Sequence, residues 1–172
     1  MQEDLKINSE CPRIYLKQGE FFFSDNRPVA VITVLGSCVS VTFYSSELQV
    51  GAITHAVLPD PASGYAHFDH GPGWYVRSSI KEVLERFSGM DQRPMDLEVK
   101  VFGGSRMYTP DVYERGLCRS VGESNVLCAL HTLKSFNIRP RVVEVGGGKG
   151  RRLVFYPALG EVWVKKINSS FR

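Results

Sequence analysis

The sequence lacks several patterns that identify common protein classes. No apolar run in its 172 residues is long enough to span a membrane, and the polar residues 1–10 contain no apolar core of a secretory signal. We therefore expect a cytoplasmic protein. Internal repeats and low-complexity tracts are also absent. At 43% hydrophobic and 23% charged residues, this length favours a single domain over residues 13–172, preceded by a flexible lead at 1–12.

Missing motifs also argue against nucleotide and nucleic-acid binding. The net charge is only +3, and the one compact basic run is Lys149, Arg151 and Arg152. The glycine-rich segment 146–150 lacks the GxxxxGK(S/T) pattern and leads into a predicted strand, so it provides no helix N-terminus for a phosphate. We expect a tight turn whose three basic residues form a rim for an acidic protein partner.

No HExxH or CxxC pattern is present, so the sequence offers no standard set of metal ligands. The loop His67-Phe68-Asp69-His70 holds two imidazoles and a carboxylate, which keeps a metal site as a minor alternative to a solvent-facing loop. We expect neither a metal nor an organic cofactor.

The four cysteines differ in their surroundings. In a reducing compartment disulfides are not expected. Cys128 lies in the apolar run 126–130 and is typical of a small buried hydrophobe, whereas Cys11 lies near the start and Cys118 in a polar loop. Only Cys38 follows a Gly-Ser turn at the entrance of a predicted strand and has a histidine, His55, in a suitable place.

Two predicted strands bring Cys38 and His55 together. Apolar and polar residues alternate over 39–44 and 50–55, with Val39, Val41 and Phe43 on one face of the first strand. If the strands pair antiparallel across a turn at 45–49, the start of one lies beside the end of the other. The thiol and the imidazole then share one edge of the sheet and meet in an accessible cleft.

A thiol beside an imidazole can act as a nucleophile, because the histidine takes the thiol proton and later protonates the leaving group. A third group must bond the other ring nitrogen; Thr33 is the candidate, with Thr54 and Ser37 as weaker ones. The backbone at Gly36 and Ser37 can point amides at a developing oxyanion, although a plain bend needs the same glycine. A buried structural cysteine and a core histidine remain the simpler alternative from spacing alone.

Along the chain, short strands are predicted at 14–17 and 20–24, with Gly19 in the turn between them, and further strands at 29–35, 97–102, 142–145, 153–156 and 161–167. Helical periodicity predicts amphipathic helices at about 74–87 and 123–137. The buried stripe of the second helix is expected to be Val126, Leu127, Leu130, Leu133 and Phe136. Clustered strands with inserted helices indicate an α+β fold with mixed or largely antiparallel sheets, sandwich-like, flanked by helices.

Four ordered motifs resemble the CheD family of chemoreceptor glutamine deamidases. They are LGSCVSV with the histidine of THAVLP, then VFGGSRM, VGESN and VGGGKGRRLVFYPALGEVWVKK, together covering roughly residues 14–166. The resemblance implies a fold similar to that of a deamidating bacterial toxin and an active site made of a cysteine, a histidine and a threonine. Cys38 and His55 stand on the motif positions, and Thr33 is the best fit for the threonine. Family members tend to have an aspartate where this chain has Arg77.

The resemblance further implies hydrolysis of glutamine side-chain amides on methyl-accepting chemotaxis receptors, a protein-glutamine glutaminase activity that needs no cofactor. It also implies a second partner, a CheC-type phosphatase. Two other functions compete with this one. The chain could be a binding module that regulates such a phosphatase with little catalysis, or a cysteine-dependent methylesterase or thioesterase, because the same thiolate attacks esters.

Overall fold

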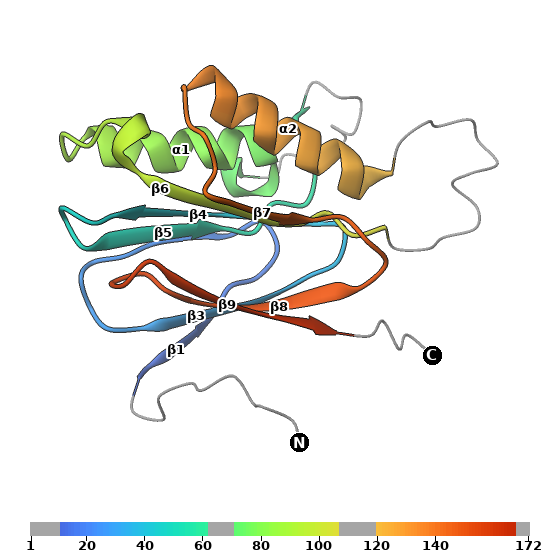
Figure 1. Ribbon diagram of the computed structural model, residues 1–172, viewed down its shortest axis with the longest axis horizontal. Coiled ribbons are helices and arrows are strands. Elements are labelled where there is room, and N and C mark those ends of the chain that lie inside the picture. Colours follow the sequence, from blue (N-terminus) through green and yellow to red (C-terminus); the bar gives the residue numbers. More distant parts are fainter. Residues whose placement is uncertain (1–10, 62–70, 107–119, 168–172) are drawn as a thin grey trace.

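The computed structural model describes residues 11–61, 71–106 and 120–167 of the chain. Within these ranges two β-sheets stack face to face, and two helices cover the outer face of one sheet, which makes three layers (Figure 1). The predicted α+β architecture, with mixed sheets in a sandwich and flanking helices, is confirmed. The loop 67–70, Cys118 and most of the predicted lead lie outside the described residues.

The sheet away from the helices has four strands. In spatial order they are β1 (Arg13–Tyr15), β3 (Ala30–Leu35), β8 (Gly150–Tyr156) and β9 (Glu161–Ile167). The helix-covered sheet has five, in the order β2 (Phe21–Phe23), β5 (Val50–Thr54), β4 (Val39–Ser45), β6 (Glu98–Gly103) and β7 (Val142–Val145). The pairs β1/β3 and β6/β7 are parallel and the others antiparallel. The two short strands on either side of Gly19 therefore join different sheets.

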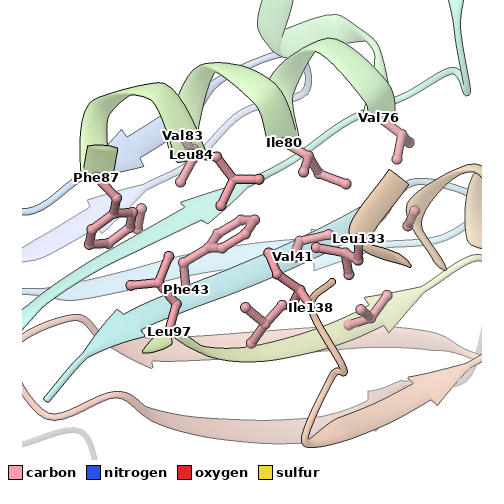
Figure 2. Packing of buried hydrophobic residues seen from close by; sticks show 14 of the residues in the cluster. Val41, Phe43, Val76, Ile80, Val83, Leu84, Phe87, Leu97, Leu133 and Ile138 are labelled. Carbon is pink, nitrogen blue, oxygen red and sulfur yellow. The ribbon is translucent and has the colours of Figure 1, made fainter. Parts of the chain in front are cut away.

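Strand β4 explains the order of the layers. Val41 and Phe43 belong to the large buried cluster that α1 (Val76–Ser88) completes from above (Figure 2). Because side chains alternate along a strand, Ser40 and Thr42 point the other way, into the space between the two sheets. The polar face of β4, which the sequence analysis separated from its apolar face, is thus buried in the sandwich and lines the space where Cys38 and His55 lie.

The first helix agrees with its predicted pattern, because the five apolar residues of its stripe, Val76, Ile80, Val83, Leu84 and Phe87, are all buried. The second helix, α2 (Val121–Ser135), differs. Its buried residues are Gly122, Asn125, Ala129, Thr132 and Leu133. The expected stripe is only partly right: Leu133 is buried, Val126, Leu130 and Phe136 are half-buried against the cluster, and Leu127 is half-buried outside it. Small and polar residues at the contact let α2 approach the sheet closely.

Two shorter 3₁₀ turns, η2 (Pro72–Trp74) and η3 (Pro94–Asp96), precede α1 and β6. The second helix starts two residues before its predicted start, because Ser120 and Glu123 form a capping box in which each side chain accepts from the other residue's backbone N–H. None of the helices in the described ranges is long and apolar enough to cross a membrane.

Replacing Phe87 tests the contact between α1 and the sheet. Its ring is fully buried and lies 4.8 Å, centroid to centroid, from the Phe23 ring of β2. We expect Phe87→Ala to lower the free energy of unfolding by about 3–5 kcal/mol, through lost burial and the cavity left behind. Urea denaturation followed by circular dichroism measures it, with Phe87→Leu as the milder control. A loss under about 1 kcal/mol would contradict this account of the core.

Candidate active site

The register of β4 and β5 places Cys38 and His55 on one face of the sheet. Val39 and Ala56 exchange two backbone hydrogen bonds, of 3.0 and 2.9 Å, which extend the antiparallel pairing past the end of β5. In this register His55 lies opposite Ser40, so Cys38, two residues earlier, is its diagonal neighbour on the same face. Cys38 packs with Leu35 and Leu153 of the other sheet, so this face is the one between the sheets.

Thr33 reaches the same space from β3 of the four-stranded sheet. Its Oγ1 lies 2.7 Å from Nδ1 of His55 and 3.0 Å from the carbonyl oxygen of Leu16, to which it donates. The threonine hydroxyl has one proton, so when that proton goes to Leu16 the oxygen accepts from Nδ1–H. This chain of hydrogen bonds selects the tautomer in which Nε2 of His55 carries a free lone pair.

The free nitrogen is buried. Among the described residues, Nε2 of His55 has no hydrogen-bond partner, and no hydrogen bond joins it to the Cys38 sulfur in this state. A buried, unpaired acceptor costs free energy, and such atoms are uncommon outside functional sites. Cys38, at the diagonal position on the same face, is a chemically suitable partner for this nitrogen.

The described residues do not place the two groups in the accessible cleft expected from the sequence, because both side chains are buried. Cys38 is 4% exposed and His55 3% exposed. Burial raises the pKa of the Cys38 thiol, although its own backbone amide and Gln18 oppose the shift. Burial likewise lowers the pKa of His55, against the opposing effects of the Leu16 backbone and Glu20. At neutral pH the pair is therefore a thiol and an uncharged imidazole, because the low dielectric disfavours both charges.

The turn before β4 is held through its carbonyl groups. Gly36 O accepts from Ser105 N at 2.9 Å, and Cys38 O accepts from Gly104 N at 2.8 Å. In the described part of the chain, the amides of Ser37 and Cys38 donate no backbone hydrogen bond. Amides without a backbone acceptor, beside carbonyls held in hydrogen bonds, are the arrangement that an oxyanion site requires. Gly103 is needed for this contact, since a Cβ there would lie 2.2 Å from Cys38 O.

Asn125 of α2 connects the two halves of the site, and the sequence analysis did not identify it. Its Nδ2 donates to Ser37 O at 3.0 Å and to Val57 O at 2.8 Å, and its side chain is fully buried. One amide group thus joins the residue before Cys38 to a residue just after His55. An asparagine in the helix beside Val126 and Ala129, on a face otherwise apolar or small, was the available signal.

Gln18, in the turn between β1 and β2, is a second residue that sequence reasoning missed. Its Nε2 lies 3.8 Å from Sγ of Cys38, in position to donate to the sulfur. The spacing along the chain contains no sign of this contact, because twenty residues and a change of sheet separate the two positions.

One basic residue of the glycine-rich turn after β7 is buried and bonded within the protein. Arg151 is 4% exposed, donates to Ser105 Oγ and Gly146 O, and lies 3.5 Å from the Glu144 carboxylate. The predicted basic rim therefore lacks Arg151, because a buried guanidinium needs these partners. Lys149 is exposed and Arg152 half-buried.

The two other residues singled out in the sequence have structural contacts outside the site. Arg77, at the start of α1, forms an ion pair with Asp60. Cys128 is half-buried and donates to Pro59 O at 3.0 Å, so it is a free cysteine, like Cys11 and Cys38. Both contacts hold α1 and α2 to the chain that leaves the site after His55.

Comparisons with known proteins agree on one family. A family model described as CheD chemotactic sensory transduction matches residues 57–166. The "probable chemoreceptor glutamine deamidase CheD 2" of Geobacter sulfurreducens is 41% identical over 160 residues, 92% of each chain. The corresponding protein of Nitratidesulfovibrio vulgaris is 39% identical over 94% of this chain and 80% of its own length. The "chemoreceptor glutamine deamidase CheD" of Thermotoga maritima is 30% identical over 87% and 88%.

The family model begins after His55, so it does not itself cover Thr33, Cys38 and His55. The alignment with the Geobacter protein covers 92% of the chain and so necessarily includes positions 33–55. Among solved structures, the hypothetical protein YfiH of Bacillus licheniformis covers 72% of this chain and 49% of its own at 14% identity, with a TM-score of 0.41. That likeness is too distant to inform the function.

Removing the Thr33 hydroxyl tests the chain of hydrogen bonds. Thr33→Val keeps the shape but removes the hydroxyl that contacts both Nδ1 of His55 and Leu16 O, so this hydroxyl no longer selects the tautomer and orientation of the imidazole. We expect kcat/KM for deamidation to fall on the order of 100-fold, with Thr33→Ser retaining most of the activity. Equal activity of the valine and serine variants would show that the hydroxyl is not required.

The pKa of His55 predicts a pH dependence of stability. Burial holds the folded pKa below the unfolded value of about 6.5, so below that pH the unfolded chain binds a proton that the folded chain does not. Stability contributed by the neutral imidazole is present above pH 6.5 and lost as the pH falls further. Urea denaturation at pH 7.5 and 5.5 should show a smaller loss for His55→Gln, by up to about 1.4 kcal/mol. Equal losses would contradict a depressed pKa.

Proposed function

The chain belongs to the CheD family, and from this premise we propose that it is a chemoreceptor glutamine deamidase in which Cys38 is the nucleophile, His55 the general base and acid, and Thr33 the residue that orients His55. The observation that carries the assignment of roles is the Thr33 hydroxyl between His55 Nδ1 and Leu16 O, because it leaves Nε2 as a proton acceptor on the face that Cys38 shares.

In the first half of the proposed reaction, the Cys38 sulfur attacks the carboxamide carbon of a receptor glutamine while its proton moves to His55 Nε2. Burial raises the pKa of the thiol and lowers that of the imidazole, which favours proton transfer during the attack over an ion pair formed beforehand. The amides of Ser37 and Cys38 stabilise the oxyanion. His55 then gives the proton to the nitrogen as the carbon–nitrogen bond breaks, which releases ammonia and leaves a thioester.

In the second half, water attacks the thioester and gives a proton to the same imidazole. The carbon–sulfur bond breaks, the sulfur regains that proton, and the product is a glutamate side chain. His55 thus acts first as a base and then as an acid in each half of the reaction, and this scheme requires no further catalytic group.

The proposal includes the partners and the location that the family implies. The substrates are glutamines in the cytoplasmic part of methyl-accepting receptors, which makes the protein cytoplasmic. A CheC-type phosphatase is a second partner. Lys149 and Arg152, without Arg151, remain available for an acidic partner, because the exposed lysine and half-buried arginine keep their charges near the surface.

The deep burial of Cys38 favours one competing function, a binding module with little catalysis. Such a module would bind a CheC-type phosphatase and leave receptor glutamines unchanged. Nε2 of His55 has no hydrogen-bond partner among the described residues, which favours catalysis, because a purely structural histidine in the core normally bonds through both nitrogens.

Mass spectrometry of a receptor cytoplasmic fragment separates these functions. Incubation with the protein should raise the mass of glutamine-bearing peptides by about 1 Da per site, and Cys38→Ala should abolish the change. Cys128→Ala is the matched control, since it removes a free cysteine that donates to Pro59 O outside the site, and it should leave the rate within about twofold. An unchanged receptor with tight binding of a CheC-type phosphatase would favour the module, and loss of mass from methylated glutamates would favour an esterase.

A further inference from the structure

The turn that carries Gln18 is attached to the catalytic histidine. Gly19 N donates to His55 O at 2.8 Å, and His55 N donates to Glu20 O at 2.9 Å. The Glu20 side chain closes the turn by accepting from Lys17 N at 2.8 Å. Backbone hydrogen bonds on both sides of Gly19 therefore fix the position of Gln18 relative to the imidazole.

A second contact holds the turn from the side of η2. A Cβ on Gly73 would lie 2.1 Å from Gly19 O, and a Cβ on Gly19 would lie 2.4 Å from the Trp74 ring. The two backbones thus touch, and Trp74 in turn accepts from Val57 N at 2.9 Å, two residues after His55. These contacts hold the backbone of the turn in place, so at Gln18 only the side chain is free to rotate.

That side chain extends from the surface to the sulfur. Gln18 is exposed, whereas Cys38 is 4% exposed, and the amide nitrogen of Gln18 lies 3.8 Å from Sγ. In the described part of the chain the carboxamide has no other hydrogen-bond partner. The apolar side chains around the sulfur, Leu35, Phe102 and Leu153, come from inside the sandwich. Among the described residues, Gln18 is the polar group that approaches the sulfur from an exposed position.

Gln18 has the same side chain as the substrate of the proposed reaction. We propose that the Gln18 carboxamide occupies the place of the substrate's carboxamide over Cys38 in the resting protein, and that a receptor glutamine must displace it before the sulfur can attack. This inference rests on the proposed function for the identity of the substrate, and on the geometry alone for the covering of the sulfur.

The contact is weak enough to be displaced. The distance of 3.8 Å between the amide nitrogen and the sulfur makes this a long hydrogen bond. Rotation about the side-chain bonds of Gln18 breaks it without moving the backbone of the turn. Gln18 also fails to activate the thiol, since the pKa of Cys38 stays raised despite this donor. The residue therefore acts as a cover that competes with the substrate, and its removal should open the site.

Alkylation of the intact protein by iodoacetamide tests the cover independently of deamidation. We expect Gln18→Ala to speed alkylation of Cys38 by about three- to tenfold, measured by peptide mass spectrometry. Lys17→Ala, a neighbouring exposed change in the same turn, should leave the rate unchanged. Cys128 in the same samples reports general loosening of the fold. A Cys38 rate that is unchanged in Gln18→Ala, or that rises together with that of Cys128, overturns the proposal, and a slower rate identifies Gln18 as an activating donor instead.

Kinetics with the receptor fragment test the surrogate role of Gln18, that is, whether its carboxamide occupies the place of the substrate's carboxamide. Because the cover competes with the substrate, Gln18→Ala should lower KM by a similar factor and leave kcat within about twofold. Faster alkylation with an unchanged KM would mean that Gln18 shields the sulfur without occupying the substrate's place, which contradicts the surrogate role. If neither protein deamidates the receptor, the proposed function fails and the surrogate role with it, while the alkylation ratio still decides whether Gln18 covers Cys38.

Discussion

The hydrogen bond between Thr33 and His55 crosses from one sheet to the other, and the rest of the site depends on it. Thr33 belongs to β3 of the four-stranded sheet, whereas His55 follows β5 of the five-stranded sheet. The bond forms only when the two sheets stack in their observed register, and it decides which imidazole nitrogen is free to take a proton. Stacking of the sheets therefore also selects the tautomer of His55, since neither sheet alone holds both residues.

Burial of the site has a cost and a consequence. Cys38 is 4% exposed and His55 3% exposed, and burial raises the pKa of the thiol and lowers that of the imidazole. The uncharged forms are therefore favoured, so the resting site lacks the thiolate that many cysteine enzymes use. In the proposed reaction, the oxyanion and the transferred proton would interact with fixed dipoles in a medium that screens charges little. A site of this kind reacts poorly with chance electrophiles and depends on the substrate to complete it, which agrees with a protein that must act on selected side chains only.

Segments far apart in the sequence keep the site in shape. Asn125 on α2 ties the Cys38 turn to the chain after His55, and Gly103 at the end of β6 lets the backbone approach the Cys38 carbonyl. The turn at Gln18 bonds to both sides of the His55 backbone. The first two contacts give the motifs VGESN and VFGGSRM a physical role beside the cysteine motif, because Asn125 and Gly103 each contact the turn that carries Cys38.

The sequence by itself determined the strand pair with Cys38 and His55 at one edge, the stripe of α1, the α+β class and Thr33 as a candidate, because alternation and spacing are local properties of the chain. Only the tertiary structure decided the burial of the sulfur, the rotated face of α2, the internal use of Arg151, and the contacts of Gln18 and Asn125. Each of these features depends on which surfaces meet when the sheets and helices stack. The residue pattern within one segment does not indicate which other segment will pack against it.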